Sequence, residues 1–129
     1  MHRDLKLENI LIKNVCSLDG SQGSIKDTKV LKIADFGISG VADQFNPEVD
    51  WGTLRYMSPE VLSGRTKLNS PAVDVWACGV ILYLLVTGKN PFNGNSSSSI
   101  MESIIKKPLE FPSNILLTVK CKNLIKHLL

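Results

Sequence analysis

The sequence has few cysteines, little net charge and no long apolar run. Its three cysteines, Cys16, Cys78 and Cys121, stand at no spacing that is typical of a metal or redox site. Because their number is odd, we expect no disulfide framework, and instead reduced thiols in a cytoplasmic, intracellular protein. Fifteen basic and twelve acidic residues leave a formal net charge of only +3, which does not indicate a nucleic acid or a membrane as partner.

Membrane-spanning and secretory patterns are also missing. The longest apolar stretch, residues 75–86, follows Asp74 and is 12 residues long, whereas a helix that crosses a bilayer needs about 20. This stretch therefore predicts a helix buried in the core. The N-terminal residues 1–4 show no apolar run behind a basic start, so no secretory signal is expected.

The composition is that of one globular domain. Hydrophobic residues make up 43% and charged residues 21% of the 129 positions. Helical spacing together with start and stop signals predicts a mainly α fold with a short β-hairpin. The hairpin strands are expected at 10–12 and 30–33 with a 17-residue loop between them, and helices at 71–87, at about 97–106 and at about 116–129.

Local signals define the remaining segments. Residues 35–56 show no sustained period and are expected to be irregular. Ser58 supplies an N-cap, Pro59 suits the first helical position and Glu60 places an acid in the first turn. A short helix is therefore predicted after Ser58, with Gly64 as its end.

The run from His2 to Asn9 places three chemically active side chains just before the first strand. Asp4, Lys6 and Asn9 carry a carboxylate, an ammonium and an amide. The carboxylate can orient a hydroxyl and accept its proton, the ammonium can neutralise charge on a moving phosphoryl group, and the amide oxygen can hold a hard cation. The spacing indicates phosphoryl transfer, and the alternative is a solvated charged turn ahead of a strand.

This run resembles the catalytic loop of eukaryotic protein kinases, H-R-D-L-x-x-x-N, over residues 2–9. The resemblance implies that Asp4 is the catalytic base, that Lys6 contacts the transferring phosphate of ATP and that Asn9 binds Mg²⁺. It also implies that His2 gives structural support. A lysine at position 6 is the serine/threonine-kinase pattern.

A second motif, Ala34–Gly37, resembles the metal loop of the same family, 34–37. The resemblance implies that Asp35 chelates the magnesium that bridges the β- and γ-phosphates, because a carboxylate suits a small hard cation. Gly37 would permit the backbone turn, and Phe36 would pack so as to report the active or inactive arrangement. For this tetrapeptide alone, an Asp-x-Gly turn that closes a strand is the alternative.

The sequence that leads to Glu60 resembles the end of a kinase activation segment, which would span 35–60. Thr53 matches the family threonine whose hydroxyl meets the catalytic aspartate and lysine. Residues 54–58 would form the shelf for the substrate residue after the acceptor. Ser58 stands where the family usually has alanine and is expected to cap the next helix. Glu60 is assigned to structural support, with its usual arginine partner beyond the C-terminal residue.

Asp74 opens a run that resembles the start of the family's central buried helix, 71–87. A buried carboxylate needs hydrogen-bond donors. The family solution is the backbone of the catalytic loop near His2 and Arg3. The resemblance therefore implies that Asp74 supports the loop and is not itself a catalyst.

Acidic residues suggest how the site is activated and how it selects a substrate. Many relatives carry an activating phosphothreonine between the positions of Glu48 and Asp50, where this chain has valine. We hypothesise that these two acids partly replace the phosphate as partners of Arg3; a solvated acidic loop is the alternative. Glu8 and Glu102 match positions that meet substrate arginine in basic-directed relatives, although Glu102 can equally be an ordinary exposed helix residue.

The resemblance covers the whole chain and implies a protein-kinase-like C-terminal lobe that is incomplete. A Gly-rich phosphate loop, a strand lysine and its helix glutamate partner do not occur before His2. Leu11 would still supply the floor under adenine. The last predicted helix has no capping residue after it, so we expect the chain to be cut inside a helix.

Two functions stay open. The first is a fragment of an active serine/threonine kinase, of calmodulin-dependent or AMP-activated type, that uses ATP and Mg²⁺ on protein substrates with basic residues near the acceptor. The isolated fragment is expected to be inactive. The second is a non-catalytic, kinase-like interaction module that binds partners through surface left bare by the missing parts. The sequence does not indicate an oligomeric state.

Overall fold

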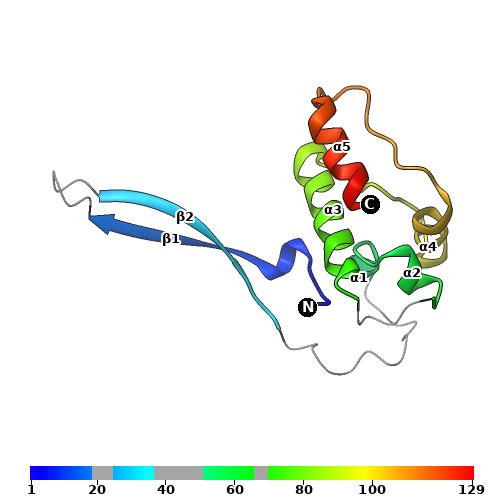
Figure 1. Ribbon diagram of the computed structural model, residues 1–129, viewed down its shortest axis with the longest axis horizontal. Coiled ribbons are helices and arrows are strands. Elements are labelled where there is room, and N and C mark those ends of the chain that lie inside the picture. Colours follow the sequence, from blue (N-terminus) through cyan, green and yellow to red (C-terminus); the bar gives the residue numbers. More distant parts are fainter. Residues whose placement is uncertain (19–24, 37–50, 66–69) are drawn as a thin grey trace.

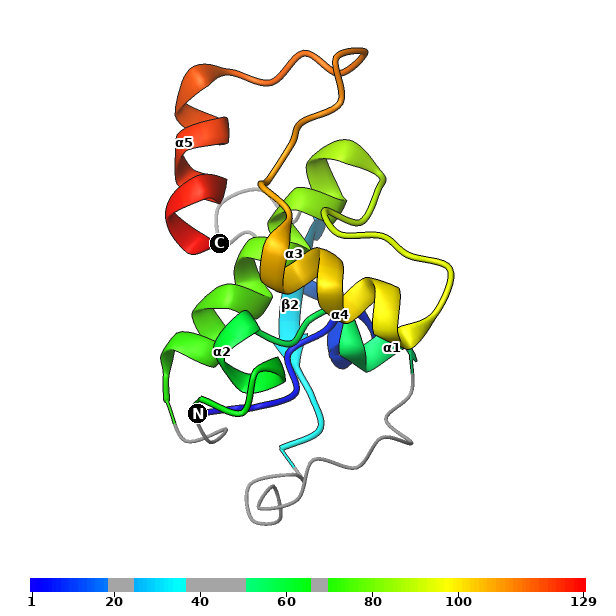
Figure 2. The same cartoon turned by 90° about the vertical axis from the view of Figure 1, so that its right-hand side faces the viewer.

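Helices and an antiparallel hairpin make up the described part of the chain. The computed structural model describes residues 1–18, 25–36, 51–65 and 70–129. In chain order the elements are the 3-10 helix η1 (Leu7–Asn9), β1 (Ile10–Leu18), β2 (Ile25–Ile33), α1 (Trp51–Leu54), α2 (Pro59–Leu62), α3 (Ala72–Thr87), α4 (Ser97–Lys106) and α5 (Val119–Leu128). Figure 1 shows the hairpin projecting away from a body formed by the helices, and in Figure 2 the hairpin lies behind that body. This mainly α architecture with a hairpin agrees with the expected fold class.

The hairpin is longer than the sequence pattern predicts. β1 and β2 pair from Ile10 opposite Ile33 to Leu18 opposite Ile25. The expectation of short strands joined by a 17-residue loop was wrong, because pairing continues through most of that stretch. The extended part lies beyond the helical body (Figure 1), and its described side chains, 13–16 and 28–29, are all exposed, so backbone hydrogen bonds hold it together. A strand without a buried face leaves no apolar alternation in the sequence.

The core forms around α3. Trp76 of α3 stacks on Phe92, with ring centroids 5.8 Å apart. Leu5, from the loop formed by residues 2–9, reaches the same cluster and is buried. The buried members of the cluster are Leu5, Leu54, Tyr56, Leu62, Trp76, Ala77, Val80, Ile81, Phe92, Ile100 and Ile104. Burial of a leucine of this kind contributes about 1.5–3 kcal/mol, so Leu5 fixes its loop against the body.

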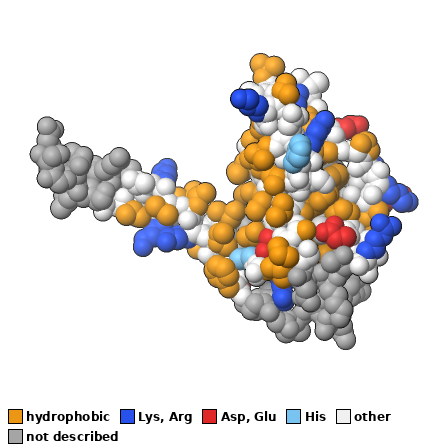
Figure 3. All heavy atoms as spheres, in the orientation of Figure 1, with side chains coloured by type: hydrophobic (Ala, Val, Ile, Leu, Met, Phe, Trp, Pro, Cys, Tyr) orange, Lys and Arg blue, Asp and Glu red, His pale blue; other side chains and the backbone are white. Residues whose placement is uncertain are grey.

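α3 begins and ends where its flanking residues predict, but it is not buried on all sides. The Ser70 hydroxyl accepts a hydrogen bond from Ala72 N at 3.3 Å, and Gly88 ends the helix with a φ of 68°. The expectation of all-round burial was wrong, because Val75 is 46% and Leu85 is 67% exposed, on a side that no described element covers. Figure 3 shows hydrophobic side chains along the hairpin and across the adjoining face of the body.

α5 packs against α3 at a glycine. A Cβ placed on Gly79 would lie 2.9 Å from the Leu128 Cβ, closer than real side chains approach, so this contact requires the absence of a side chain. Ile125 of α5 is fully buried. The helix begins three residues later than the expected position 116, because the Thr118 hydroxyl accepts a hydrogen bond from Cys121 N at 3.2 Å and so defines its start.

Two expectations about the segment before α2 were wrong. Residues 35–56 were expected to be irregular, but α1 forms a helical turn there, and its Leu54 is buried at 3% exposure. Ser58 was expected to cap α2 with its hydroxyl, but the side chain is fully buried and makes no cap hydrogen bond. The Ser58 carbonyl oxygen instead accepts from Val61 N and Leu62 N, each at 3.1 Å. The Ser58 side chain is therefore part of the buried interior, and only the backbone carbonyl of this residue bonds to the first turn of α2.

The N-terminal loop is tied to α3 by one carboxylate. His2 N donates to Asp74 Oδ2 and Arg3 N donates to Asp74 Oδ1, each at 2.8 Å. These are the contacts that the family resemblance implies for Asp74. Both carboxylate oxygens of Asp74 thus hold the loop against the start of α3 and fix its direction.

We expect Asp74→Ala to destabilise this attachment by about 3 kcal/mol, because two amides lose an ionised acceptor. Hydrogen exchange at the amides of His2 and Arg3 measures the change directly. Asp74→Asn keeps one acceptor oxygen and should cost less than the alanine variant. Glu102→Gln, which removes one exposed charge, serves as the matched control, and equal exchange in Asp74→Ala and this control would contradict the prediction.

Candidate active site

The loop of residues 2–9 folds back on itself to form the site. Leu5 is buried in the core, and η1 turns the chain so that Asn9 N donates to the Lys6 carbonyl at 3.1 Å. The turn brings the Lys6 and Asn9 side chains toward Asp4, which is only 7% exposed. The carboxylate therefore lies in a sheltered position with two polar groups against it.

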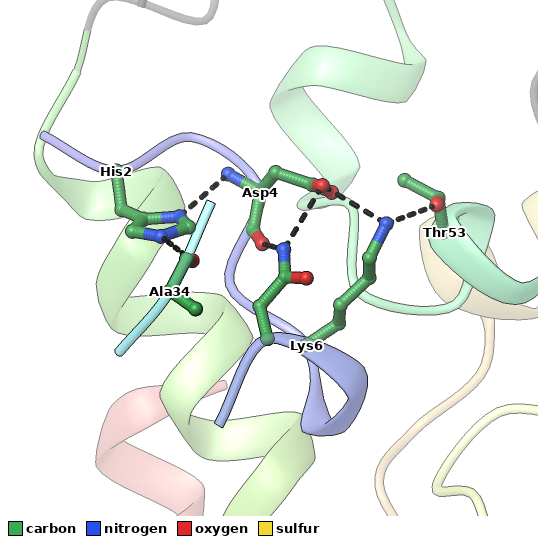
Figure 4. Close-up of polar contacts among 6 residues, drawn as sticks. His2, Asp4, Lys6, Ala34 and Thr53 are labelled. Atoms are coloured by element: carbon green, nitrogen blue, oxygen red, sulfur yellow. Dashed lines mark hydrogen bonds and ion pairs between the residues drawn. The ribbon is translucent and has the colours of Figure 1, made fainter. Parts of the chain in front are cut away.

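Three side chains from two distant segments form a continuous polar chain (Figure 4). Lys6 Nζ lies 2.9 Å from Asp4 Oδ2 and donates to Thr53 Oγ1 at 3.2 Å. Thr53 belongs to α1, so the fold joins the loop to a segment that lies 47 residues further along the chain. The threonine hydroxyl contacts the lysine directly, and it is linked to the aspartate through that lysine.

Asn9 is oriented by two bonds from its amide nitrogen. Nδ2 donates to the Asp4 carbonyl oxygen at 2.8 Å and to Asp4 Oδ2 at 3.2 Å. The opposite amide orientation would set an oxygen against two oxygens, so the bonding network assigns the nitrogen to this position. The amide oxygen of Asn9 is therefore the atom left to meet a cation.

His2 ties the loop to the end of β2. Its Nε2 lies 2.9 Å from the Ala34 carbonyl oxygen, while Asp4 N donates to Nδ1 at 3.4 Å. Because a carbonyl only accepts, Nε2 carries the proton and Nδ1 accepts, which assigns the neutral tautomer. Ala34 N also donates to the Asn9 carbonyl at 2.8 Å. The next residue, Asp35, is thus held beside the same loop.

Two non-glycine residues adopt left-handed backbone conformations next to this contact. Arg3 has a φ of 69° and Asp35 a φ of 60°. Each costs about 1–2 kcal/mol relative to ordinary backbone. Arg3 is adjacent to the hydrogen-bonded His2 and Asp35 to the hydrogen-bonded Ala34. Strain of this kind persists where surrounding bonds over-determine the chain and is typical of functional sites.

The site has a defined electrostatic character. The Asp4 carboxylate raises the pKa of Lys6 above its ordinary value of 10.5, chiefly by accepting a hydrogen bond from the ammonium. Partial burial opposes this rise, while the negative charges of Asp4, Glu8 and Asp35 reinforce it. Lys6 therefore stays cationic throughout the neutral range.

Other predicted site residues lie at the edge of this arrangement. Glu8 is exposed, and its charge acts on Lys6. Leu11 is 53% and Phe36 is 64% exposed. Glu102 lies on the exposed side of α4, where its Oε1 pairs with Lys106 Nζ at 3.0 Å.

The remaining predictions concern support and activation. The Phe36 ring lies 4.9 Å from the His2 ring, centroid to centroid. Glu60 lies in the first turn of α2. Gly37, and the residues from Glu48 to Asp50 that were predicted as partners of Arg3, lie outside the described residues.

Arg55, which the sequence predicted only as part of the 54–58 shelf, also has a structural role that was not predicted. Its Nη1 donates to the Phe92 carbonyl at 3.3 Å and to Asn93 Oδ1 at 3.2 Å. These bonds fasten the segment that follows Thr53 to the connection between α3 and α4. A single arginine between apolar residues gives no pattern, and only its place two residues after Thr53 could have drawn attention to it.

Oxygen ligands are the metal-binding groups that this site offers. The amide oxygen of Asn9 and the carboxylate of Asp35 suit a hard cation such as Mg²⁺. Among the described residues, no three histidine, cysteine, aspartate or glutamate side chains gather as a metal cluster. A site of this composition would need further oxygens from phosphate or water, as magnesium usually takes. No helix within the described ranges has the length and apolar character to cross a membrane.

Comparison with known proteins identifies a family. The family model described as protein kinase domain matches residues 1–129. The chain is 40% identical over 115 residues to mitosis inducer protein kinase cdr1 of Schizosaccharomyces pombe, which covers 88% of the chain and 17% of that protein. It is 37% identical over 130 residues to protein kinase kin1 of the same yeast, which covers 100% of the chain and 13% of that protein.

A third relative comes from a different organism. Probable serine/threonine-protein kinase MARK-A of Dictyostelium discoideum is 38% identical over 133 residues, which covers 100% of the chain and 11% of that protein. The chain thus spans only 11–17% of the length of these three relatives.

We expect Asp4→Asn to lower the pKa of Lys6, because it removes the largest cause of the rise. The ¹⁵N shift of Lys6 Nζ, followed against pH, measures this value. Since the pKa is raised in the folded state, the stabilisation linked to Lys6 is present below pH 10.5 and is lost as the pH rises through the raised value. Glu8→Gln, which removes a lesser cause, should lower the pKa less. An unchanged pKa in Asp4→Asn would mean that the ion pair does not form.

Proposed function

Because this chain belongs to the protein kinase family, we propose that it supplies the phosphate-transfer centre of a protein serine/threonine kinase. Such an enzyme moves the γ-phosphate of ATP to a serine or threonine hydroxyl of a protein substrate. The observation that carries the proposal is the contact of Lys6 with both Asp4 and Thr53, beside Asn9. A carboxylate, a cation and a hydroxyl held together in this way are suited to phosphate transfer to an alcohol. A non-catalytic interaction module would not need this arrangement.

In the proposed reaction Asp4 receives the acceptor alcohol. Its carboxylate orients the hydroxyl and takes the proton as the oxygen attacks the γ-phosphorus, while the bond from that phosphorus to the bridging oxygen breaks and ADP leaves. Lys6 lies 2.9 Å from that carboxylate and bears the positive charge that offsets charge on the moving phosphoryl group. Thr53 holds the lysine from the opposite side, so the ammonium is positioned before the substrate arrives.

Asn9 and Asp35 are the proposed holders of Mg²⁺. Magnesium, when bound with ATP, would neutralise negative charge on the β- and γ-phosphates. The Asn9 amide nitrogen is engaged by Asp4, which keeps its oxygen turned to the other side. The bonds of Ala34 to the loop limit the positions that the Asp35 backbone can take.

We further propose that the chain corresponds to an incomplete C-terminal lobe of such a kinase. The low coverage of its relatives and the exposed apolar side chains of α3, Val75 and Leu85, support this proposal. Leu11, also exposed, would form the floor under adenine. A calmodulin-dependent or AMP-activated type and an intracellular location belong to the same proposal.

We propose that Glu8, rather than Glu102, binds basic residues of the substrate near the acceptor. Glu8 is exposed beside Lys6 and so lies at the site. Glu102 already has a cationic partner, because Lys106 lowers the pKa of Glu102 by its hydrogen bond. The second candidate, a non-catalytic interaction module, draws support from the bare apolar surface, whereas the intact Asp4, Lys6 and Asn9 favour catalysis.

In the full-length protein we expect Asp4→Asn to lower kcat for peptide phosphorylation by about 10²–10⁴-fold, the usual contribution of a positioned general base. The Michaelis constant for ATP should change little, because Asp4 contacts the acceptor. Initial rates with radiolabelled ATP and a serine peptide measure both constants. Lys126→Gln, which removes one exposed charge of α5, is the control and should retain its rate. Full activity in Asp4→Asn would argue for the interaction module.

The 129-residue chain alone should bind magnesium-ATP weakly and transfer phosphate at no useful rate. The Gly-rich phosphate loop and the strand lysine that a protein kinase uses to hold ATP are not among these 129 residues. We also expect it to aggregate through its exposed apolar side chains. Turnover by the purified chain at the rate of the full-length protein would contradict this prediction, and light scattering measures the aggregation.

A further inference from the structure

A cavity lies outside the candidate active site, between the C-terminal part of α4 and the connection from α3 to α4. Its volume is about 420 Å³, and one side is open to solvent, so it can receive a side chain of an extended segment. Phe92 forms part of its wall and is only 5% exposed, since its ring stacks on Trp76 of the core. Pro91 and Pro108 add apolar surface on either side. The wall is therefore stiff and partly apolar.

Hydrogen bonds hold the edges of the cavity in place. Asn93 donates to the Asn90 carbonyl at 2.9 Å and accepts from Arg55. On the opposite side, the Tyr83 hydroxyl donates to the Glu110 carbonyl at 2.8 Å, which fastens residue 110 to α3. A ligand would therefore meet a preformed cavity and pay little to order it.

Polar groups of three kinds face this cavity. Ser103 is 2% exposed, and its hydroxyl makes no hydrogen bond with another residue of the described ranges. Lys107 and Glu110 contribute charges of opposite sign, and neither forms an ion pair within the part of the chain that the structure describes. A ligand that carries both signs of charge next to an apolar group would satisfy all of these groups.

The cavity is connected to the candidate active site. Arg55 bonds to Phe92 and Asn93 in the cavity wall, and it lies two residues after Thr53, which contacts Lys6. Residues 54–58 are the segment predicted to receive the substrate residue after the acceptor. A substrate held at this segment would lie close to the cavity, because Arg55 links the two directly.

We propose that this cavity docks an extended segment of the protein substrate, an apolar side chain flanked by one acidic and one basic residue. The proposal rests on the proposed function, because it takes a protein as the substrate. Lys107 binds the acidic residue and Glu110 the basic one, while the apolar side chain lies against Phe92 and the two prolines. Ser103 donates to a peptide carbonyl.

The test is a charge exchange in the full-length protein. Two fluorescein-labelled peptides carry one phenylalanine between a glutamate and a lysine, in opposite orders, and contain no serine, threonine or tyrosine. The native protein should bind one order about tenfold more tightly than the other, as two charge-assisted contacts allow. The double variant Lys107→Glu with Glu110→Lys should reverse that preference. Fluorescence anisotropy measures the four dissociation constants.

A control changes two charges on a helix outside the cavity. Lys120→Glu with Lys126→Glu reverses two exposed charges of α5 that do not line the cavity, and it should leave the preference of the native protein intact. Ser103→Leu fills the cavity and should weaken binding of the preferred peptide at least tenfold; if it does not fold, the charge exchange alone decides. Equal affinity for both orders, or an unreversed preference in the double variant, would overturn the proposal. Because the peptides carry no acceptor hydroxyl, this readout is independent of phosphate transfer.

Discussion

The whole site depends on the Asp74 carboxylate and the two amides that it binds. Those bonds, each 2.8 Å long, attach the start of the N-terminal loop to the first turn of α3. They therefore set the position of residues 4–9, which follow in the loop. Leu5 then anchors the loop in the core, and the turn of η1 returns Lys6 and Asn9 to Asp4. An ionised acceptor is needed at this point, because two adjacent amides that leave water require strong compensation.

A second layer of contacts brings in the parts of the chain that are remote in sequence. His2 and Asn9 hold Ala34, which follows β2, and Lys6 holds Thr53, which belongs to α1. None of these bonds is unusual in strength. Together they bring the chain before Asp35 and the turn that carries Thr53 to one loop, so the candidate active site arises from the meeting of three separate segments.

The contacts of Asp74 and the ends of α3 could be predicted, because the residues there can be accommodated in few ways. A carboxylate such as Asp74 has to find donors, and the ends of α3 follow from Ser70 and Gly88. Prediction failed where no such constraint acts. The outer hairpin meets solvent on both faces, Ser58 leaves capping to its backbone, and Arg55 acts through partners that only the fold brings near. Family resemblance supplied the roles of the site residues, which spacing alone left open.

The hairpin has a consequence for how this chain can vary. Ile10 and Ile33 are paired at its base, next to Asn9 and Ala34, and every later pair, as far as Leu18 opposite Ile25, lies further from the candidate active site. Residues added or removed in matched pairs at the outer ends of β1 and β2 would leave the base in register. The outer ends of the strands can therefore change in length, while Asp4 and Asp35 at the root of the hairpin keep their separation in space.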